Sequence, residues 1–491
     1  MGYAQNLPFE LDASFQPNVD FRDAEPFYQN GRLVYQQAGV LGDIWEDSST
    51  GKLYIAGNFI FVEDSIRYAG NICLNKDGSL FKDFNTPFES MGQFFPINDS
   101  VFFTIGQMWY SLVDTLGKVN LGWMHNLYNS VRCLHGSFIY FYEDGSSLWS
   151  NFTPNPNVDG CKIILPPDTF PHRHIVKVDP EGKWDSTFVI DADYGGLSFF
   201  PYDSNRILMC APPRFIINYG THTVNGIWRT FLDGTLDTTF HAPISDEWAD
   251  GDIVPVVEKD GKIFITGYFL LEGNNTYHHL IRLNENGSLD TTFMNHEGPT
   301  DSAGNFSSVT AIAPTEDGGY LVGGIFNKYQ GHKKNNIAKI TYNGAVEPQH
   351  FTSSGPSNHV LGNAGFIREI LPSAFGGYYV IGNFRDWNGQ PTGPIIRLHG
   401  LNVGLEEHER QVQKLKVFPN PAKESIRFYG IGSSKIENLL LIDVQGKTLE
   451  ADFWETSSNT YETNTSKLKP GMYFLKVVSE GEVAVGKFIK H

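Results

Sequence analysis

Residues 233–240 read D-G-T-L-D-T-T-F, and residues 286–293 read N-G-S-L-D-T-T-F. Two octapeptides this similar mark an internal repeat, because chance rarely produces such a copy. Weaker copies end at Phe84, Trp123, Phe188 and Phe351. A period of tens of residues is typical of a solenoid or a propeller, in which each unit is one small group of secondary-structure elements.

Upstream of each octapeptide lie two apolar segments. The first closes in Gly-x-Phe, at residues 53–59, 263–269, 320–326 and 378–384, and is predicted to be a central strand. The second has two apolar residues, a basic residue and another apolar residue, as at 280–283 and 395–398. An Asp-Gly or Asn-Gly turn flanked by alternating apolar residues is the strongest short-range hairpin signal. The basic strand and the L-D-x-x-F strand should therefore pair antiparallel.

This hairpin places a basic residue opposite an acidic one eight positions later. Opposite charges across a ladder contribute roughly 0.2–1 kcal/mol. In the first unit the two positions hold Cys73 and Phe81, and in the second Leu112 and Asn120, so both charges are lost together. A lone charge on a half-buried strand is costly. We interpret the remaining pairs as structural ion pairs: Lys177/Asp185, Arg229/Asp237, Arg282/Asp290 and Lys339/Glu347.

The two ends of the repeat region complete each other. Residues 11–15 form an L-D-x-x-F strand with nothing before it, while Arg397 is followed by no such strand, so Asp12 should pair with Arg397. From Phe15 to Phe351 the chain holds six units in 336 residues, a mean of 56 per unit. A ring whose last blade uses both ends leaves no open sheet edge. We predict an all-β chain whose residues 1–400 form a seven-bladed β-propeller closed by the N-terminal strand.

The Gly-x-Phe strand, the I-x-R-L strand and the D-G-S-L-D-T-T-F ending resemble the delta-60 repeat family of bacterial β-propeller sequences over roughly residues 8–400. The resemblance implies a propeller in an extracellular setting. It carries no motif of catalytic residues.

The sequence changes character after residue 400. Residues 401–413 are short and polar, which suits a linker, and residues 414–491 contain regularly spaced short strands, which predict a small Ig-like β-sandwich. The order V-F-P-N-P, D-V-Q-G, L-K-P-G-M-Y-F-L-K and G-K-F-I-K is similar to the type A C-terminal sorting domain of the type IX (Por) secretion system. The matching residues are Pro419, Asn420, Pro421, Asp443, Gly446, Pro470, Gly471, Tyr473, Gly486 and Lys487.

That resemblance implies a route and two partners. The chain would be exported with a cleavable leader, cross the outer membrane through the type IX translocon, and be cut by a sortase-like peptidase before attachment to lipopolysaccharide or release. The first residues lack the basic and apolar regions of a signal peptide, as expected of a mature exported chain. No run approaches the roughly 20 apolar residues that span a bilayer.

Charge and cysteine content narrow the ligand classes. A formal net charge of −18 argues against nucleic acid and an anionic membrane face as partners, and leaves sugars, neutral ligands and proteins. Cys73, Cys133 and Cys210 lie in apolar runs and are expected to be buried thiols, whereas Cys161 lies in a loop and could form a disulfide.

No catalytic, cofactor-binding or metal-binding residue is predicted. The sequences His172-Arg173-His174 and His278-His279 lack the spacing of a helical zinc site, and Asp191-Ala192-Asp193 is followed by no complete calcium-loop pattern. The candidate ligand contacts are instead Trp149, Phe152 and Phe170, in a proline-rich insert at residues 145–174 that could stack on a sugar or dock a protein. The alternative is that these aromatic residues only cover the end of the ring.

These observations favour an exported, non-catalytic cell-surface binding or adhesion propeller with a glycan or protein ligand. One alternative is a secreted glycan- or peptide-degrading enzyme with its site at the channel mouth. Another is a structural surface protein without a small ligand.

Overall fold

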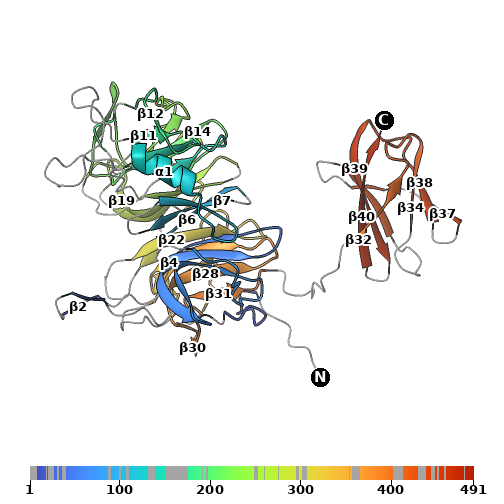
Figure 1. Ribbon diagram of the computed structural model, residues 1–491, viewed down its shortest axis with the longest axis horizontal. Helices are drawn as coiled ribbons and strands as arrows, with labels where there is room; N and C mark the ends of the chain where they lie inside the picture. Colours follow the sequence, from blue (N-terminus) through green and yellow to red (C-terminus); the bar gives the residue numbers. More distant parts are fainter. Residues whose placement is uncertain are drawn as a thin grey trace. The chain divides into compact units, whose positions relative to one another are not determined.

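A computed structural model describes most of residues 8–490. The segments outside the description are residues 18, 20–26, 30–31, 36–39, 87–89, 99–100, 107–109, 131–138, 151–174, 191, 195–196, 248–252, 259, 275, 295–297, 301–306, 353, 357–364, 402–412, 430–437, 444–447, 451–452, 458–459 and 480–481. The chain forms two compact units, Met1–Val403 and Gly404–His491 (Figure 1). No described helix is long and apolar enough to cross a membrane.

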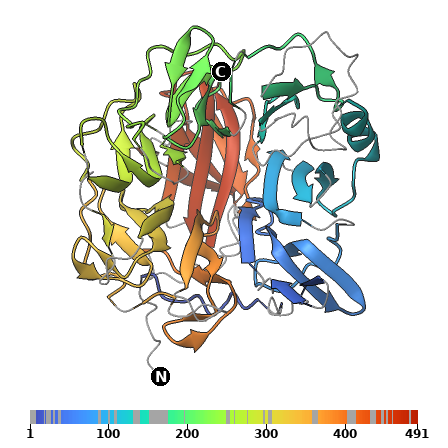
Figure 2. The ribbon, with the colours of Figure 1, turned by 90° about the vertical axis from the view of Figure 1, so that its left-hand side faces the viewer.

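The first unit is built from antiparallel sheets that follow one another along the chain. Eleven antiparallel sheets can be traced within the described residues of this unit, and seven of them hold the main strands of the repeat. Figure 2 shows them in colour order around a common centre. Their strands are β3 (Val40–Glu46), β4 (Leu53–Glu63) and β5 (Ile66–Leu74); β6 (Ser90–Asn98), β7 (Val101–Gly106) and β8 (Tyr110–Asp114); β9 (Ile139–Phe141), β10 (Ser147–Ser150), β11 (Ile175–Val178) and β12 (Trp184–Asp185); β13 (Ser198–Pro201), β14 (Arg206–Cys210) and β17 (Ile227–Phe231); β18 (Val254–Val257), β19 (Ile263–Leu270) and β20 (Tyr277–Leu283); β22 (Ser308–Pro314), β23 (Tyr320–Ile325) and β26 (Ile337–Ile340); β27 (Phe366–Pro372), β28 (Tyr378–Asn383) and β31 (Ile395–Leu398).

Smaller elements decorate these sheets. They are the hairpins β1 (Phe27–Gln29) with β2 (Arg32–Tyr35), β15 (Ile217–Tyr219) with β16 (His222–Val224), and β29 (Asp386–Trp387) with β30 (Gln390–Pro391); the set β21 (Pro299–Thr300), β24 (Lys328–Tyr329) and β25 (His332–Lys333); and the helix α1 (Leu121–Ser130).

The Gly-x-Phe segments are central strands, as predicted. Strands β4, β19, β23 and β28 each lie in the middle of a three-stranded sheet. Their first residues are mostly apolar because neighbouring sheets pack on both faces. One core cluster, for example, joins Phe264 of β19 to Tyr320 and Val322 of β23. The predicted buried thiols Cys73 and Cys210 lie free in such cores, while Cys133 and Cys161 fall outside the described residues.

The L-D-x-x-F segment pairs where expected but is shorter than a strand. Leu289 forms a single bridge to Leu283, and the Asp290 N–H donates to the Arg282 carbonyl at 2.8 Å. The chain then turns, because Asp290 Oδ1 accepts hydrogen bonds from the N–H and hydroxyl of Thr292, at 3.0 and 2.6 Å. Such a side-chain bond competes with continued ladder pairing.

In the second unit of the repeat, a helix replaces this turn. The Asn120 side chain accepts the Trp123 N–H at 3.1 Å and caps α1, which begins at Leu121. Asparagine is a favoured N-cap residue. The degenerate copy of the repeat did not predict this helix.

The N-terminal segment occupies the place of an L-D-x-x-F segment beside β31. Leu11 bridges Leu398, and the Asp12 N–H donates to the Arg397 carbonyl at 2.9 Å. The Gln16 N–H then donates to the Asp77 carbonyl at 2.8 Å, in the turn of the first sheet. The same bond links later units, at His241 to Asn286 and Met294 to Asn343, both at 2.9 Å.

The last sheet also packs on the first. Leu53, Ile55 and Ile72 share one core cluster with Tyr379, Ile381 and Ile395. Polar contacts cross the same seam: Arg368 Nε donates to the Gly42 carbonyl at 2.8 Å, and Glu46 accepts the Ser373 hydroxyl at 2.8 Å and the Ala374 N–H at 2.6 Å.

The two ends of the sheets differ in how their strands are connected. At one end, which we call the turn face, short turns at residues 75–79, 231–235, 258–262, 284–288, 315–319 and 341–345 are each closed by a glycine N–H bonded to the carbonyl three residues earlier. Gly287 shows why glycine is needed there: its φ is +86°, and a Cβ would lie 2.6 Å from the His241 carbonyl oxygen.

At the opposite end, the loop face, the second strand of each sheet joins the third. These connections include residues 211–226, which hold β15 and β16; 326–336, which hold β24 and β25; and 384–394, which hold β29 and β30. The segment between β10 and β11 joins the sheet at the same end, but residues 151–174 lie outside the described part. The long connections between second and third strands therefore fall on one face, whereas α1 lies against a glycine turn of the next sheet, where the Asn126 side chain donates to the Glu181 carbonyl at 2.8 Å.

The second unit has two sheets that share one core. One holds β32 (Gln413–Lys414), β40 (Glu482–Lys490), β39 (Gly471–Ser479), β35 (Asn438–Asp443) and β36 (Thr448–Glu450), and the other holds β33 (Val417–Phe418), β34 (Ser425–Tyr429), β38 (Thr460–Asn464) and β37 (Phe453–Ser457). Phe428 and Tyr461 from one sheet pack with Leu475 and Phe488 from the other. The first strand begins at Gln413, the last residue of the predicted linker.

Candidate functional site

The charged pairs of the repeat lie deep between neighbouring sheets. Arg229 Nε lies 2.8 Å from Asp237 Oδ2, and Arg282 Nε lies 2.8 Å from Asp290 Oδ2. Each guanidinium also donates from Nη1 to a carbonyl of the following unit, Glu285 or Tyr342, at 2.7 Å. Each of these arginines therefore stabilises its own hairpin through the aspartate and contacts the next sheet through a backbone carbonyl.

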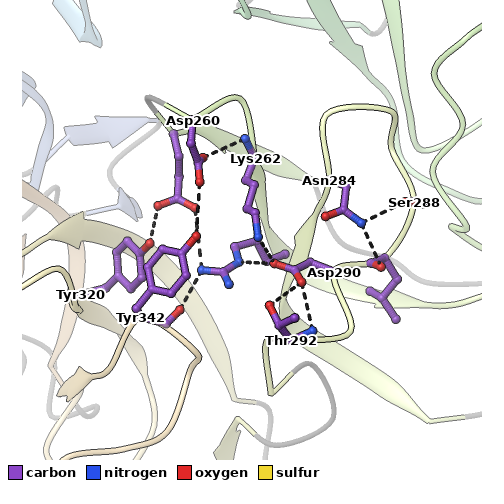
Figure 3. Close-up of polar contacts among 11 residues, drawn as sticks. Asp260, Lys262, Asn284, Ser288, Asp290, Thr292, Tyr320 and Tyr342 are labelled. Atoms are coloured by element: carbon purple, nitrogen blue, oxygen red, sulfur yellow. Dashed lines mark hydrogen bonds and ion pairs between the residues drawn. The ribbon is translucent and has the colours of Figure 1, made fainter.

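The pair at Arg282 extends into a larger polar network (Figure 3). Lys262 Nζ lies 2.7 Å from Asp290 Oδ2, and the Tyr320 hydroxyl donates to Glu258. Burial alone would raise the pKa of Asp290, but hydrogen bonds from Lys262, Thr292 and Arg282 outweigh it and hold this pKa well below its usual value. Asp290 is therefore an acceptor anchored in its charged form.

The other pairs vary in geometry. Lys339 Nζ contacts Glu347 at 2.7 Å and Asp317 at 3.0 Å, and Arg397 Nη1 lies 3.3 Å from Asp12 Oδ2. The contacts of Lys339 with Glu347 and of Arg397 with Asp12 link the basic strand to the L-D-x-x-F segment that pairs with it.

Lys177 stands opposite Asp185 in the ladder, as the eight-residue spacing predicts. Its ammonium group lies 4.5 Å from the centre of the Tyr142 ring and 5.6 Å from that of Phe188, which places it over aromatic faces. The charge of Lys177 still helps to lower the pKa of Asp185, after the hydrogen bond from Thr187.

A different carboxyl pair lies where the last sheet meets the first. Burial raises the pKa of Glu369 on β27 well above its ordinary value, and the negative charge of Asp43 on β3 raises it further. Arg368 and the N–H of Ile44 act in the opposite direction without cancelling the effect. Glu369 therefore holds its proton at a pH where a solvated glutamate has lost it.

Replacing Glu369 with glutamine is expected to change how stability depends on pH. A carboxyl group with a raised pKa in the fold stabilises the protein below the unfolded pKa, about 4.3, and this contribution is lost as pH rises toward the folded pKa. The slope reaches about 1.4 kcal/mol per pH unit for one proton. Urea unfolding from pH 4 to 8 should show this decline in the natural chain and not in Glu369→Gln. Equal slopes would contradict the assignment.

The loop face carries an aromatic pair on the sheet of β18, β19 and β20. The rings of Tyr268 and Tyr277 are stacked, with centroids 4.2 Å apart and an interplanar angle of 8°. Tyr277 is 41% exposed, and His279 lies 5.4 Å from the Tyr268 ring. Burial, followed by the charge of His278, lowers the pKa of His279 to about 4, so this imidazole is neutral at pH 7. The arrangement offers an uncharged aromatic surface.

A second aromatic contact lies on the loop face of the preceding sheet. Tyr194 stacks on Phe215 at 4.8 Å, Arg214 lies 4.9 Å from the Phe215 ring, and Ile216 is 59% exposed. The repeat pattern singled out neither cluster. Tyr268 could have been found from the sequence, since it fills the variable position of a Gly-x-Phe motif that holds Asn58 or Asn383 in other units.

The structure corrects the prediction that Trp149 contacts a ligand. This residue lies within β10, only 1% exposed, with its ring among Phe103, Tyr110 and Trp123 and its Nε1 donating to the Ser147 hydroxyl at 2.8 Å. The prediction failed because strand β10 runs on to Ser150, so the insert begins later than its composition indicates. The other two predicted contacts, Phe152 and Phe170, lie outside the described residues.

No group of three metal-ligating side chains occurs in the described part of the chain. Asp193 accepts hydrogen bonds from the N–H and side chain of Asn218, at 2.9 and 2.5 Å, while Asp191, His172 and His174 are not described. His278 is buried in the sheet, stacked against Phe269.

The predicted sorting residues of the second unit gather on its last strands. Asn420 Oδ1 accepts the Ile489 N–H at 2.9 Å, and Asn420 Nδ2 donates to the Lys487 carbonyl at 3.2 Å, so the Pro419-Asn420-Pro421 turn is tied to β40. A Cβ at Gly486 would lie 2.5 Å from Val417 Cγ2. These residues therefore serve internal packing.

The remaining sorting residues lie at the start of β39 and beside it. The Tyr473 hydroxyl donates to the Lys469 carbonyl at 3.1 Å, across Pro470 and Gly471, and Asp443 stands opposite Tyr473 in the ladder. Gly446 is outside the described residues.

Comparisons with known families agree with this division. Residues 416–491 match the secretion system C-terminal sorting domain, and residues 215–240 and 258–293 match a domain of unknown function (DUF5122) described as a beta-propeller. The fold and these matches define a secreted cell-surface protein: a repeat β-propeller, consistent with the delta-60 resemblance, followed by a type IX sorting domain. A search of curated proteins found no match to this chain.

Solved structures with detectable likeness are distant. They include the extracellular domains of a one-component system and of a hybrid two-component system from B. thetaiotaomicron, at 9% and 10% identity and TM-scores of 0.38 and 0.39. Both matches cover 92% of this chain, which spans 56% and 57% of theirs, little more than half their length. A protein of unknown function from Bacteroides thetaiotaomicron matches at 10% identity and a TM-score of 0.31, over 74% of this chain and 98% of that chain.

Proposed function

We propose that this protein is a non-catalytic binding or adhesion protein, delivered to the cell surface by the type IX translocon and its sortase-like peptidase. Residues 1–400 form a seven-bladed propeller closed by the N-terminal strand, residues 401–413 are a linker, and residues 414–491 are an Ig-like sorting sandwich. The bridge from Leu11 to Leu398 and the contacts of Glu46 with Ser373 and Ala374 support the closure.

The difference between the two propeller faces carries the binding proposal. The turn face repeats one tight turn, whereas the loop face holds the long connections and the described aromatic clusters at Tyr268/Tyr277 and Tyr194/Phe215. Loops on a rigid scaffold are where binding residues concentrate. Stacked aromatic rings with one open face bind neutral, partly apolar ligands, so the ligand is a glycan or a protein segment rather than an anion.

Substitution of the aromatic pair tests this role. The natural chain and the double variant Tyr268→Ala/Tyr277→Ala are applied to a glycan array and to a set of surface proteins. We expect at least a 10-fold loss of binding in the double variant, because both ring faces are removed. Phe231→Ala is the matched control, since Phe231 is an aromatic residue, 41% exposed, on the turn face. Equal losses in both variants, or no ligand for the natural chain, would defeat the proposal.

The second candidate is a secreted glycan- or peptide-degrading enzyme, and one observation favours it. Glu369 and Asp43 combine a raised pKa with a neighbouring carboxylate on the first strands of adjacent sheets, a combination found at acid–base sites. Turnover of a polysaccharide or peptide that disappears in Glu369→Gln would replace the binding proposal with the enzyme.

A further inference from the structure

Three strands of the five-stranded sheet in the second unit, β35, β39 and β40, carry large apolar residues on both faces. Its inner face packs Leu439, Leu441, Leu475, Val477 and Phe488 into the core. Because successive side chains of a strand alternate, the residues between them point away from that core. The register pairs these outward residues with one another: Leu440 with Lys476, Ile442 with Phe474, Phe474 with Lys487, and Met472 with Ile489.

We call the outward set Leu440, Ile442, Met472, Phe474 and Ile489 the apolar outer face. Met472 is 40% exposed and Ile489 is 45% exposed, and the other three are partly buried by their neighbours. An antiparallel sheet with one solvated face normally alternates apolar and polar residues. Three adjacent strands here carry apolar residues where this alternation would place polar ones, so the outward residues form one contiguous patch. Exposed apolar patches of this kind mark interaction sites.

The other sheet of the same unit provides the contrast. Its outward residues include Ser425, Arg427 and Glu462, with Arg427 Nε 3.1 Å from Glu462 Oε2. One large apolar side chain, Trp454, is 46% exposed there. The two-sided apolar pattern is therefore a property of one sheet and not of the whole unit.

Charge indicates the kind of surface that would cover this patch. Lys476 and Lys487 stand in register with Leu440 and Phe474 on the outer face, and one acidic residue, Glu450 of the edge strand β36, stands opposite Leu440. Residues 414–491 hold 11 Lys and Arg against 9 Asp and Glu, a formal charge of +2, whereas the whole chain carries −18. A partner with an apolar centre and carboxylates at its rim would fit this surface.

We propose that the apolar outer face is the surface by which the sorting unit docks on a protein of the type IX secretion machinery. The matched sorting family spans this unit and names the system that must recognise it. A second copy of the chain fits less well, because a two-fold contact through this face would bring Lys476 and Lys487 against the same lysines. The predicted sorting residues Asn420 and Gly486 are engaged in internal packing and leave this face free. This inference concerns the sorting unit and does not depend on what the propeller binds.

The test uses the full chain, expressed with an export leader in a bacterium that has the type IX system. Met472→Thr/Ile489→Thr removes the two most exposed apolar residues while keeping a residue that favours strands. We expect surface protein, measured with antibody on intact cells, to fall at least 10-fold, with folded protein accumulating in the periplasm, as we also expect for a chain lacking residues 414–491. The control Trp454→Thr, on the other sheet, should be displayed normally.

A second variant separates docking from folding. Lys476→Glu/Lys487→Glu reverses the charge of the face without touching the core, and it should also reduce display at least 10-fold while the purified protein keeps the thermal midpoint of the natural chain. Normal display of both double variants would overturn the proposal, as would an equal loss in Trp454→Thr. Loss of a dimer of the purified chain in Met472→Thr/Ile489→Thr, with display unchanged, would assign the face to a second copy instead.

Discussion

Replacing Arg282 with leucine is expected to lower the free energy of unfolding of the propeller by about 3–5 kcal/mol, the usual cost of breaking a buried ion pair. The guanidinium is fully buried and serves Asp290, Glu258 and the Tyr342 carbonyl. Its removal leaves Asp290 with donors from Lys262 and Thr292, leaves Glu258 with the Tyr320 hydroxyl, and withdraws the bond to the Tyr342 carbonyl of the next unit. Urea or thermal unfolding of the purified chain measures the loss.

The repeat supplies its own rescue of that variant. The second repeat of the propeller holds Leu112 and Asn120 at the positions equivalent to Arg282 and Asp290, and Asn120 caps the helix that follows. The double variant Arg282→Leu/Asp290→Asn should therefore recover at least half of the stability that Arg282→Leu loses. Lys82→Met, which removes an exposed partner of Glu63, is the control and should leave stability unchanged. A double variant less stable than Arg282→Leu would show that the cost of an unpaired charge does not explain why the second repeat lacks both charges, at Leu112 and Asn120.

Removing residues 1–17 is expected to abolish cooperative folding of the propeller. Phe9 and Phe15 are 4% and 5% exposed, and each loss of a buried phenylalanine costs about 3–5 kcal/mol. Together these losses approach the whole stability of an ordinary domain, about 5–15 kcal/mol. The edge of β31, which Leu11 covers, is exposed as well, and open edges promote association. Size-exclusion chromatography with light scattering and a thermal scan measure both effects.

A shorter deletion and a peptide sharpen this experiment. Removal of residues 1–7 alone, which keeps Phe9 and Phe15, is the matched control and should leave the cooperative transition in place. A synthetic peptide of residues 8–17, added in excess to the truncated chain, should restore a monomer with a cooperative transition. A truncated chain that melts like the natural one would show that the N-terminal strand is not needed to close the fold.

The strand order within each repeat could be predicted because the same sequence pattern recurs several times along the chain. The Gly-x-Phe strands had to be central, since they are apolar on both faces, and the spacing of Arg282 and Asp290 fixed the hairpin register. The sequence did not predict how short the strand pairing of the L-D-x-x-F segment is, because Asp290 both ends the pairing and accepts the hydrogen bonds of the turn. A strand residue and a capping residue look alike in a sequence.

The candidate site was predicted less well, for a related reason. Sites lie where units differ, and a single departure does not say whether a side chain points into a core or into solvent. Trp149 seemed to belong to an insert and is buried in β10, whereas Tyr268 occupies a variable motif position and lies on the loop face. The raised pKa of Glu369 comes first from burial and then from the charge of Asp43, more than 300 residues away in the chain, so no local pattern could have revealed it.

The bridge between Leu11 and Leu398 also bears on how the molecule comes to be folded. Leu11 has its partner 387 residues further along the chain, so it cannot pair until that part of the chain has been made. Contacts of such high order slow folding, because the entropy of closing the loop is lost before any contact compensates for it. We therefore expect the first unit to complete its cooperative folding only after residues 395–398 are available to pair with the segment around Leu11.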